Sequence, residues 1–355
     1  MLAKEFFEKI NCVDAVLVFQ EVNTFYLSGY SNTNAYYLIF NDKTYYLTDS
    51  RYIEEAKASI KDDIEFISIT YQNTYDKILE LLIAHNAKSV GFEDNRIKLS
   101  DYIDLNSHLK DFKLVGIGKF IDDIRAIKSD EEIAKIQKAC DINKIAFTKT
   151  LKLVKEGISE KDFALELEYQ MLKNGASGLA FDTICAFGTD TSKPHAHVSD
   201  RIIQSGDLVT VDFGCKFDGY CSDCTRTFAF GNIDKEQENI YNIVLEAQLL
   251  GVDTVTAGLT GYEVDKIVRD FIGSYGYYDN FSHGLGHSVG IEIHENPRLS
   301  QTCDTVLKEN MIMTIEPGIY IEGKCGVRIE DSVVITNEKP VILTAGIDKK
   351  LLKIN

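Results

Sequence analysis

The chain is built around residues 208–228, which read LVTVDFGCKFDGYCSDCTRTF. Apolar and polar residues alternate in the first part of this stretch, so one face of the predicted strand is apolar and the other presents Asp212. Asp218-Gly219 follows as a hairpin signal, because both central residues of a type I′ turn need a positive φ. The stretch is therefore predicted to be a β-hairpin that carries acidic side chains.

Two of these acidic side chains should lie next to each other. A two-residue turn places Asp212 opposite Thr225, and Asp223 becomes the diagonal neighbour of Asp212 on the same face. Neighbouring carboxylates repel each other unless a proton or a cation lies between them. A metal ion is the cation that this pair suggests, whereas an ordinary hairpin would leave Asp212 on a solvated face and Asp223 in a turn.

Composition predicts a soluble globular protein. Apolar residues make up 45% and charged residues 26% of the 355 residues, and no run approaches the roughly eighteen apolar residues of a membrane span. The formal charge of -17 opposes binding to nucleic acid and to anionic membranes. The amino terminus shows no secretory signal, so we expect a cytoplasmic location with the eight cysteines as reduced thiols.

Residues 1–124 are expected to form an α/β domain. Helical patterns at 52–60, 75–86 and 100–109 alternate with short apolar runs that are typical of strands. The predicted strands lie at 14–19, 35–40, 44–48, 64–69, 89–92 and 113–117. No glycine-rich phosphate loop follows any of them, so nucleotide binding is not indicated.

Residues 125–355 repeat one order of elements. Capping residues at Ser129, Ser159, Asp234 and Thr260 mark the starts of four helices. Predicted strands follow each pair of helices, at 181–187, 208–214 and 221–230, and again at 289–293, 311–321 and 327–336. Two successive helix–helix–sheet units suggest an internal duplication whose halves face each other across a shared cleft.

The second half supplies a carboxylate pair of its own. Glu316 ends an apolar run in MIMTIEPGIYI (311–321), and Pro317 removes a ladder donor just after it. Glu330 begins the next predicted strand, and a three-residue loop at 322–324 places it directly opposite Glu316.

Histidines add a nitrogen ligand to these carboxylates. Five of the seven histidines fall between residues 195 and 294, and HGLGH (283–287) puts an imidazole on a glycine-rich segment that can approach the sheets closely. The five candidate ligands are Asp212, Asp223, His287, Glu316 and Glu330. Bridging carboxylates suit two metal ions roughly 3.5–4 Å apart, and oxygen donors with one imidazole favour Mn²⁺, Co²⁺, Fe²⁺ or Zn²⁺.

These motifs resemble those of the pita-bread metallopeptidases, in the group of Xaa-Pro dipeptidase (prolidase) and aminopeptidase P. The matching segments are Pro194-His195, VDFG (211–214), SDCTRT (222–227), HGLGHSVG (283–290), EIHENP (292–297), IEPG (315–318) and VRIED (327–331). In the front half, FYLSGY (25–30) and YLTDSRY (46–52) are similar to the creatinase-type amino-terminal domain. The resemblance implies an α+β fold, with a creatinase-type α/β domain at 1–124 and a pita-bread catalytic domain at 125–355.

The resemblance also implies roles for single residues. It makes the five candidate ligands a dinuclear site for two divalent ions per subunit, with Mn²⁺ as the first expectation and Co²⁺, Zn²⁺ or Fe²⁺ as alternatives. It assigns substrate and transition-state roles to His195, His283 and His294, an orienting role to Arg328 and a proton relay to Glu316. His197 stands where the family often has a small residue, so its role stays open between contact with the substrate and a place at the rim of the site. Short proline-containing peptides are the expected substrates, and a homodimer is the expected assembly.

The expected reaction is hydrolysis of the Xaa-Pro bond of dipeptides or short peptides by a metal-bridging hydroxide, because two divalent ions lower the pKa of a bound water towards about 7. One alternative is an aminopeptidase P, which releases the first residue of longer Xaa-Pro peptides. Methionine aminopeptidase resembles the second half but usually lacks the front domain. A metal-free peptide-binding protein on the same fold is the non-enzymatic alternative, and five retained ligands argue against it.

Overall fold

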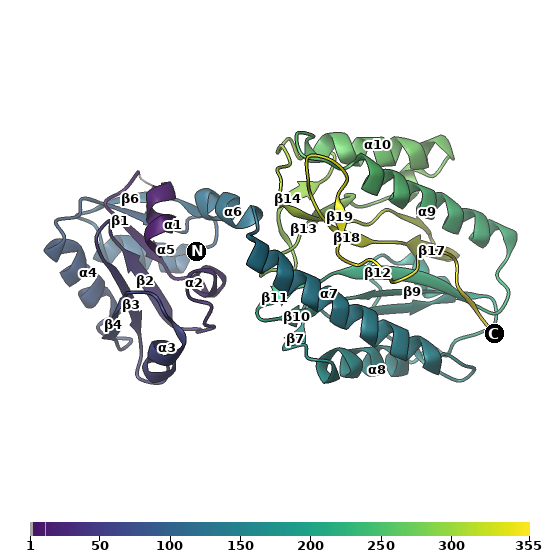
Figure 1. Ribbon diagram of the computed structural model, residues 1–355, viewed down its shortest axis with the longest axis horizontal. Helices are drawn as coiled ribbons and strands as arrows, with labels where there is room; N and C mark the ends of the chain where they lie inside the picture. Colours follow the sequence, from purple (N-terminus) through teal and green to yellow (C-terminus); the bar gives the residue numbers. More distant parts are fainter. Residues whose placement is uncertain (1–2, 11) are drawn as a thin grey trace. The chain divides into compact units, whose positions relative to one another are not determined.

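The chain divides into two units, Met1–Ile124 and Arg125–Asn355 (Figure 1). The computed structural model describes residues 3–10 and 12–355. Both units mix helices and strands, and this confirms the α+β class. Across this described range, no helix is both long and apolar enough to cross a bilayer.

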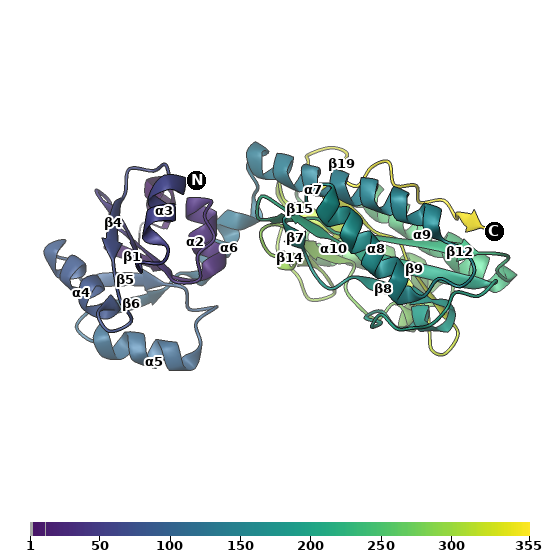
Figure 2. The same cartoon turned by 90° about the horizontal axis from the view of Figure 1, so that it is seen from below.

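The first unit is built on a six-stranded sheet with the strand order β4-β3-β2-β1-β5-β6. Its strands are β1 (Ala15–Val18), β2 (Ala35–Ile39), β3 (Thr44–Thr48), β4 (Glu65–Ser68), β5 (Ser89–Phe92) and β6 (Lys113–Gly116). Its helices are α1 (Ala3–Ile10), α2 (Glu21–Ser28), α3 (Ile53–Ser59), α4 (Thr74–Ala84), α5 (Leu99–His108) and α6 (Gly118–Ala126), the last of which crosses the unit boundary. Figure 2 shows α4 and α5 on one side of the sheet, where they bury a shared apolar cluster with the strands.

The second unit contains four long helices, which begin as predicted. They are α7 (Asp130–Thr150), α8 (Glu160–Lys173), α9 (Lys235–Thr254) and α10 (Gly261–Ser274), with short 3₁₀ helices η1 (Leu151–Leu153), η2 (Gly188–Ser192) and η3 (Tyr278–Asn280). Each long helix opens with a capping box, in which the side chains of the first and fourth residues satisfy free backbone N–H groups. This local hydrogen bonding fixes where the helices start.

The strands of the second unit form several sheets between the two helix pairs (Figures 1 and 2). The strands are β7 (Gly178–Leu179), β8 (Ile184–Phe187), β9 (Asp207–Phe213), β10 (Cys215–Phe217), β11 (Tyr220–Cys221), β12 (Cys224–Phe230), β13 (Gly286–Ser288), β14 (Glu295–Leu299), β15 (Ile312–Ile315), β16 (Gly318–Ile321), β17 (Cys325–Arg328), β18 (Asp331–Val334), β19 (Val341–Ile342) and β20 (Lys353–Ile354). One apolar core joins α7 and α8 to β8, β9 and β12, and another joins α9 and α10 to β15 and β17. Two helix–sheet halves, as predicted, therefore make up this unit.

Both predicted hairpin registers are confirmed. Asp218 and Gly219 have positive φ angles of 48° and 83°, and Asp212 lies opposite Thr225. In the second hairpin the strands close around the predicted loop at 322–324. The same register holds on both sides of residues 316–317, so Glu316 lies opposite Glu330 in a gap between two ladders.

Some predicted elements differ from the structure. Residues 289–293 form a loop between β13 and β14 and not a strand. The long strands predicted at 221–230, 311–321 and 327–336 are each interrupted, and the interruptions fall at or next to Asp223, Glu316 and Glu330. The helices α1, α2 and α6, of eight or nine residues each, were not predicted.

Candidate active site

A cavity of about 530 Å³ opens in the second unit, with walls from both helix–sheet halves. The predicted site residues that line it are His195, Asp212, Asp223, His283, His287, His294, Glu316 and Arg328. Glu330 is more deeply buried, with 1% of its surface exposed. The fold thus brings into one place residues that lie more than a hundred positions apart in the sequence.

Three of the predicted carboxylate ligands lie close together, and each is at or next to the end of a β-strand. Asp212 is the penultimate residue of β9, Asp223 lies between β11 and β12, and Glu330 lies between β17 and β18. One carboxylate oxygen from each lies within 4.8 Å of the others. The interruptions let neighbouring segments approach, since the backbone N–H of Glu330 donates to the carbonyl of Thr225 at 3.1 Å.

His287 and Glu316 complete the set of predicted ligands. The Nε2 atom of His287 lies 3.5 Å from a carboxylate oxygen of Asp223 and 3.4 Å from one of Glu316. Thr314 supports both residues, because its hydroxyl accepts from the His287 N–H at 3.0 Å and donates to Glu316 Oε1 at 3.2 Å. Burial lowers the pKa of His287 to about 3, so the imidazole is neutral and keeps a lone pair for a metal ion.

The carboxylates are in an electrostatically unfavourable position by themselves. Burial raises the pKa of Glu316 to about 8. Burial, with repulsion from neighbouring carboxylates, raises the pKa values of Asp223 and Glu330 well above the ordinary range. Asp212 Oδ1 and Glu330 Oε1 are buried without a hydrogen-bond partner among the described residues. Such buried acceptors are rare, and a divalent cation fits both the oxygen-rich donor set and its charge.

Arg328 connects this centre to the other side of the cavity. Its guanidinium donates to Asp212 Oδ2 at 2.8 Å and to Thr225 Oγ1 at 3.1 Å. Another of its N–H groups donates to the hydroxyl of Tyr320 at 2.7 Å, and this hydroxyl lies 3.0 Å from Nε2 of His283. One chain of contacts therefore holds an arginine, a tyrosine and a histidine in fixed relative positions.

The remaining histidines differ in their surroundings. The ring of His294 packs edge-on against His287, with centroids 4.5 Å apart. Burial and the charge of Arg298 lower the pKa of His294, so its imidazole is neutral at pH 7. His195 is exposed at the cavity wall, whereas His197 lines a neighbouring cavity of about 500 Å³ and not the first one.

Two further residues of the site were not singled out by the sequence. Arg298 lines the cavity, and Tyr320 bridges Arg328 and His283. Along β14 buried and exposed residues alternate, with Arg298 on the exposed side. The sequence does not show this alternation, because one of the buried positions is the charged residue Glu295.

Sequence models of two known domains match this chain. Residues 134–337 match metallopeptidase family M24, and residues 4–127 match the creatinase/prolidase N-terminal domain. Among known proteins, the Xaa-Pro dipeptidase of Pyrococcus furiosus is 42% identical over 337 residues, which cover 94% of each chain.

The similar solved structures include both a dipeptidase and an aminopeptidase. The Xaa-Pro dipeptidase from Bacillus anthracis superposes with a TM-score of 0.94 at 36% identity, over 99% of this chain and 100% of that one. The X-Pro aminopeptidase from Thermotoga maritima MSB8 has a TM-score of 0.92 at 34% identity, over 99% of both chains. This chain belongs to metallopeptidase family M24, with a creatinase-type amino-terminal domain and a pita-bread second domain, and it is a peptidase. Membership in this family implies divalent metal ions.

Proposed function

We propose that this chain is a dinuclear-metal peptidase that hydrolyses the Xaa-Pro bond of dipeptides or short peptides. The observation that carries the proposal is the convergence of four carboxylates and one imidazole beside the cavity. Two of the buried oxygens have no hydrogen-bond partner within the described part of the chain, and a cation would satisfy them. The Xaa-Pro dipeptidases among the relatives support the substrate class.

We infer that two divalent ions are held by Asp212, Asp223, His287, Glu316 and Glu330. The four carboxylates would supply the oxygen donors for these ions, and oxygen donors with one imidazole suit Mn²⁺, our first choice, and also Co²⁺, Zn²⁺ or Fe²⁺. Such ions, when bound, acidify a water molecule and polarise the scissile carbonyl.

Glu316 is the proposed proton carrier. Its side chain is 17% exposed, and Thr314 holds one of its carboxylate oxygens, Oε1. The other oxygen can take the proton of the attacking water and deliver it to the proline nitrogen, which leaves as a secondary amine and must be protonated.

His195 and His294 are the proposed donors to the oxyanion that forms on the scissile carbonyl. Both line the cavity, and the lowered pKa of His294 keeps one ring N–H available as a neutral donor. Donors placed where negative charge develops stabilise the transition state more than the substrate. Arg328 and His283 are proposed to orient this side of the site through the Tyr320 hydroxyl.

The walls of the cavity suit a proline ring. An Xaa-Pro bond has no amide hydrogen, so a peptidase that depends on gripping this N–H rejects it. Phe181, Ile184 and Ile293 line the cavity and offer apolar surface to a pyrrolidine ring.

Arg298 favours dipeptides over longer peptides. It lines the cavity, is exposed, and forms no ion pair with any carboxylate in residues 3–10 and 12–355. In an Xaa-Pro dipeptide the proline carries a free carboxylate, which can form a charge-assisted hydrogen bond with a guanidinium. A longer peptide has an amide at that position and gains no such pairing.

The aminopeptidase from Thermotoga maritima supports a second candidate, release of the first residue from longer Xaa-Pro peptides. The two are separated by comparing kcat/KM for Ala-Pro and Ala-Pro-Gly-Gly at equal metal loading. Preference for Ala-Pro that disappears in Arg298→Met supports the dipeptidase. Equal or better cleavage of the longer peptide overturns it and leaves the metal chemistry untouched.

A metal-free peptide-binding protein on the same fold is tested by metal analysis of the purified protein together with Ala-Pro hydrolysis before and after chelation. Absence of bound metal and of hydrolysis would favour that alternative. The homodimer and the cytoplasmic location stay predictions, and sedimentation velocity tests the first of them.

A further inference from the structure

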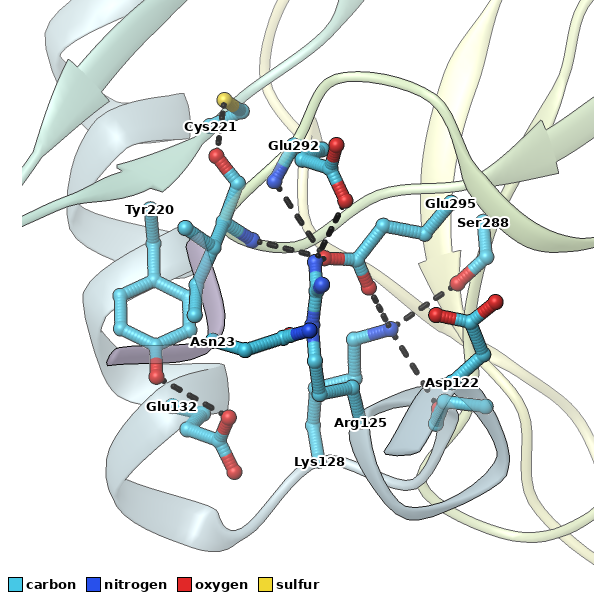
Figure 3. A network of polar contacts seen from close by, with 12 residues as sticks. Asn23, Asp122, Arg125, Lys128, Glu132, Tyr220, Cys221, Ser288, Glu292 and Glu295 are labelled. Carbon is cyan, nitrogen blue, oxygen red and sulfur yellow. Dashed lines mark hydrogen bonds and ion pairs between the residues drawn. The ribbon is translucent and has the colours of Figure 1, made fainter. Parts of the chain in front are cut away.

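A buried cluster of charged side chains lies in the second unit, outside the cavity lining. Figure 3 shows the carboxylate of Glu295 between the guanidinium of Arg125 and the ammonium of Lys128. Lys128 Nζ lies 3.2 Å from Glu295 Oε2, and Arg125 forms an ion pair with Oε1. The side chains of Arg125, Lys128 and Glu295 are 3%, 1% and 6% exposed. We call these three residues the Glu295 cluster.

The carboxylate of Glu295 also holds the backbone of the preceding loop. The N–H groups of Ile291 and Glu292 donate to its Oε1 atom at 3.1 Å and 3.3 Å. A Cβ atom on Gly290 would lie 2.5 Å from Oε2, so a side chain at this position would displace the carboxylate. The loop at 289–294 is therefore wrapped around one buried carboxylate.

Both ends of this loop adjoin histidines of the site. Lys128 Nζ donates to the hydroxyl of Ser288 at 2.9 Å, and Ser288 directly follows His287. At the other end Glu295 directly follows His294, which lines the cavity. The cluster therefore contacts the chain immediately next to two histidines that face the predicted metal centre.

Stability alone does not account for such a cluster. Desolvating charges is costly, and replacement of a buried ion-pair network by apolar side chains of similar volume is often neutral or stabilising. Burial by itself would raise the pKa of Glu295, but the charges of Lys128 and Arg125 lower it below the ordinary value. The carboxylate stays ionised and can hold backbone donors in a fixed geometry, which apolar side chains cannot do.

We propose that Arg125, Lys128 and Glu295 are positioning residues that hold the loop at 289–294, and with it His294, in the geometry needed for hydrolysis. This rests on the proposed function of His294 as a donor to the oxyanion. Of the described residues that line the cavity, none belongs to the cluster, so its members act through His294 and do not touch the substrate. A displacement of about 1 Å at such a donor can lower the rate up to about a hundredfold.

A double-mutant cycle between the cluster and His294 tests the proposal. Lys128→Met removes the ammonium and keeps an unbranched side chain of similar size. In the manganese-loaded full chain it should lower kcat for Ala-Pro about 10-fold, but only about 2-fold or less when His294→Ala is already present. Amide hydrogen exchange in residues 289–295 should become faster while the metal content stays the same.

Lys266→Met is the matched control. Lys266 forms an exposed ion pair with Asp270 on α10, at 2.5 Å, and does not belong to the Glu295 cluster. Lys266→Met should leave both kcat and the amide hydrogen exchange of residues 289–295 unchanged. This result would show that loss of a lysine charge does not by itself cause the changes expected for Lys128→Met.

The outcomes are distinct. An equal loss of kcat from Lys128→Met in both backgrounds, or unchanged exchange in the loop, overturns the positioning role. If Lys128→Met does not fold, Glu295→Gln takes its place in the cycle, because it keeps an acceptor for the two backbone N–H groups and removes only the charge. If His294→Ala keeps full kcat, the proposed function of His294 is wrong. In that case the amide hydrogen exchange rates of residues 289–295 alone test whether the Glu295 cluster holds the loop.

Discussion

Removing metal should make the free energy of unfolding fall as the pH rises from about 6 to about 8. In the folded chain burial raises the pKa of Glu316 to about 8, whereas the ordinary value is 4.5. The folded state therefore binds more protons than the unfolded state between these two values. Stability from this group is fully present below the unfolded pKa and is lost as the pH rises through the folded pKa.

The magnitude follows from this one group. Each extra proton in the folded state changes the free energy of unfolding by about 1.4 kcal/mol per pH unit, and by less near its own pKa, which gives about 2 kcal/mol over this range for Glu316. Asp223 and Glu330 act in the same direction, because burial raises their pKa values too. His283 and His287 act in the opposite direction, since burial lowers their pKa values to about 4 and about 3 and they must be neutral when folded.

The variant Glu316→Gln keeps these histidines and is the matched control. Denaturant titrations followed by circular dichroism, on both chelated proteins at the two pH values, measure the free energy of unfolding. The wild type should lose about 2 kcal/mol more than the variant as the pH rises. Adding Mn²⁺ to the wild type should remove its loss, because the ion displaces the bound protons. The same pH dependence in the two chelated proteins would refute the reasoning.

Three further outcomes are expected. Asp223→Asn and Glu330→Gln should each abolish Ala-Pro hydrolysis and lower the bound metal from about two ions per subunit, with an unchanged circular dichroism spectrum. Full activity after exhaustive chelation would contradict the metal assignment. His294→Ala and His195→Ala should each lower kcat about a hundredfold or more with unchanged metal content, because one oxyanion donor contributes about that factor. Loss of metal in either variant would instead identify that histidine as a metal ligand. Arg298→Met should raise KM for Ala-Pro about tenfold or more with a smaller effect on kcat, because it removes a charge-assisted hydrogen bond to the substrate carboxylate. An unchanged KM would rule out that contact.

Rules that act over a few residues predicted much of the fold. The hairpin at 208–228 and the capping boxes at Ser129, Asp234 and Thr260 form as expected. Each capping box is a set of hydrogen bonds between residues three positions apart, and the turn depends on the φ angles of two adjacent residues. The neighbourhood of Asp212 and Asp223 follows in the same way from the register of one hairpin.

Family motifs extended the prediction to the whole site. His287 and Glu316 were named from glycine-rich and proline-containing motifs, and the structure brings the imidazole of His287 within 3.5 Å of both the Glu316 and the Asp223 carboxylates. Hairpin register could not have predicted that meeting, because it requires the two halves of the unit to pack against each other. Arg298 became visible only through the cavity that this packing forms.

The sequence by itself determined the hairpins, the helix starts and the residues of the candidate metal centre, while only the tertiary structure decided the path of residues 289–294. Val289, Ile291 and Ile293 alternate as in a strand, yet the N–H of Ile291 bonds to the Glu295 carboxylate and not to a neighbouring strand. That carboxylate stays ionised because Lys128, 167 positions earlier in the chain, lies beside it. Local patterns state which backbone a short segment prefers, but a buried charge from a distant segment can offer its N–H groups stronger partners than a β-ladder does.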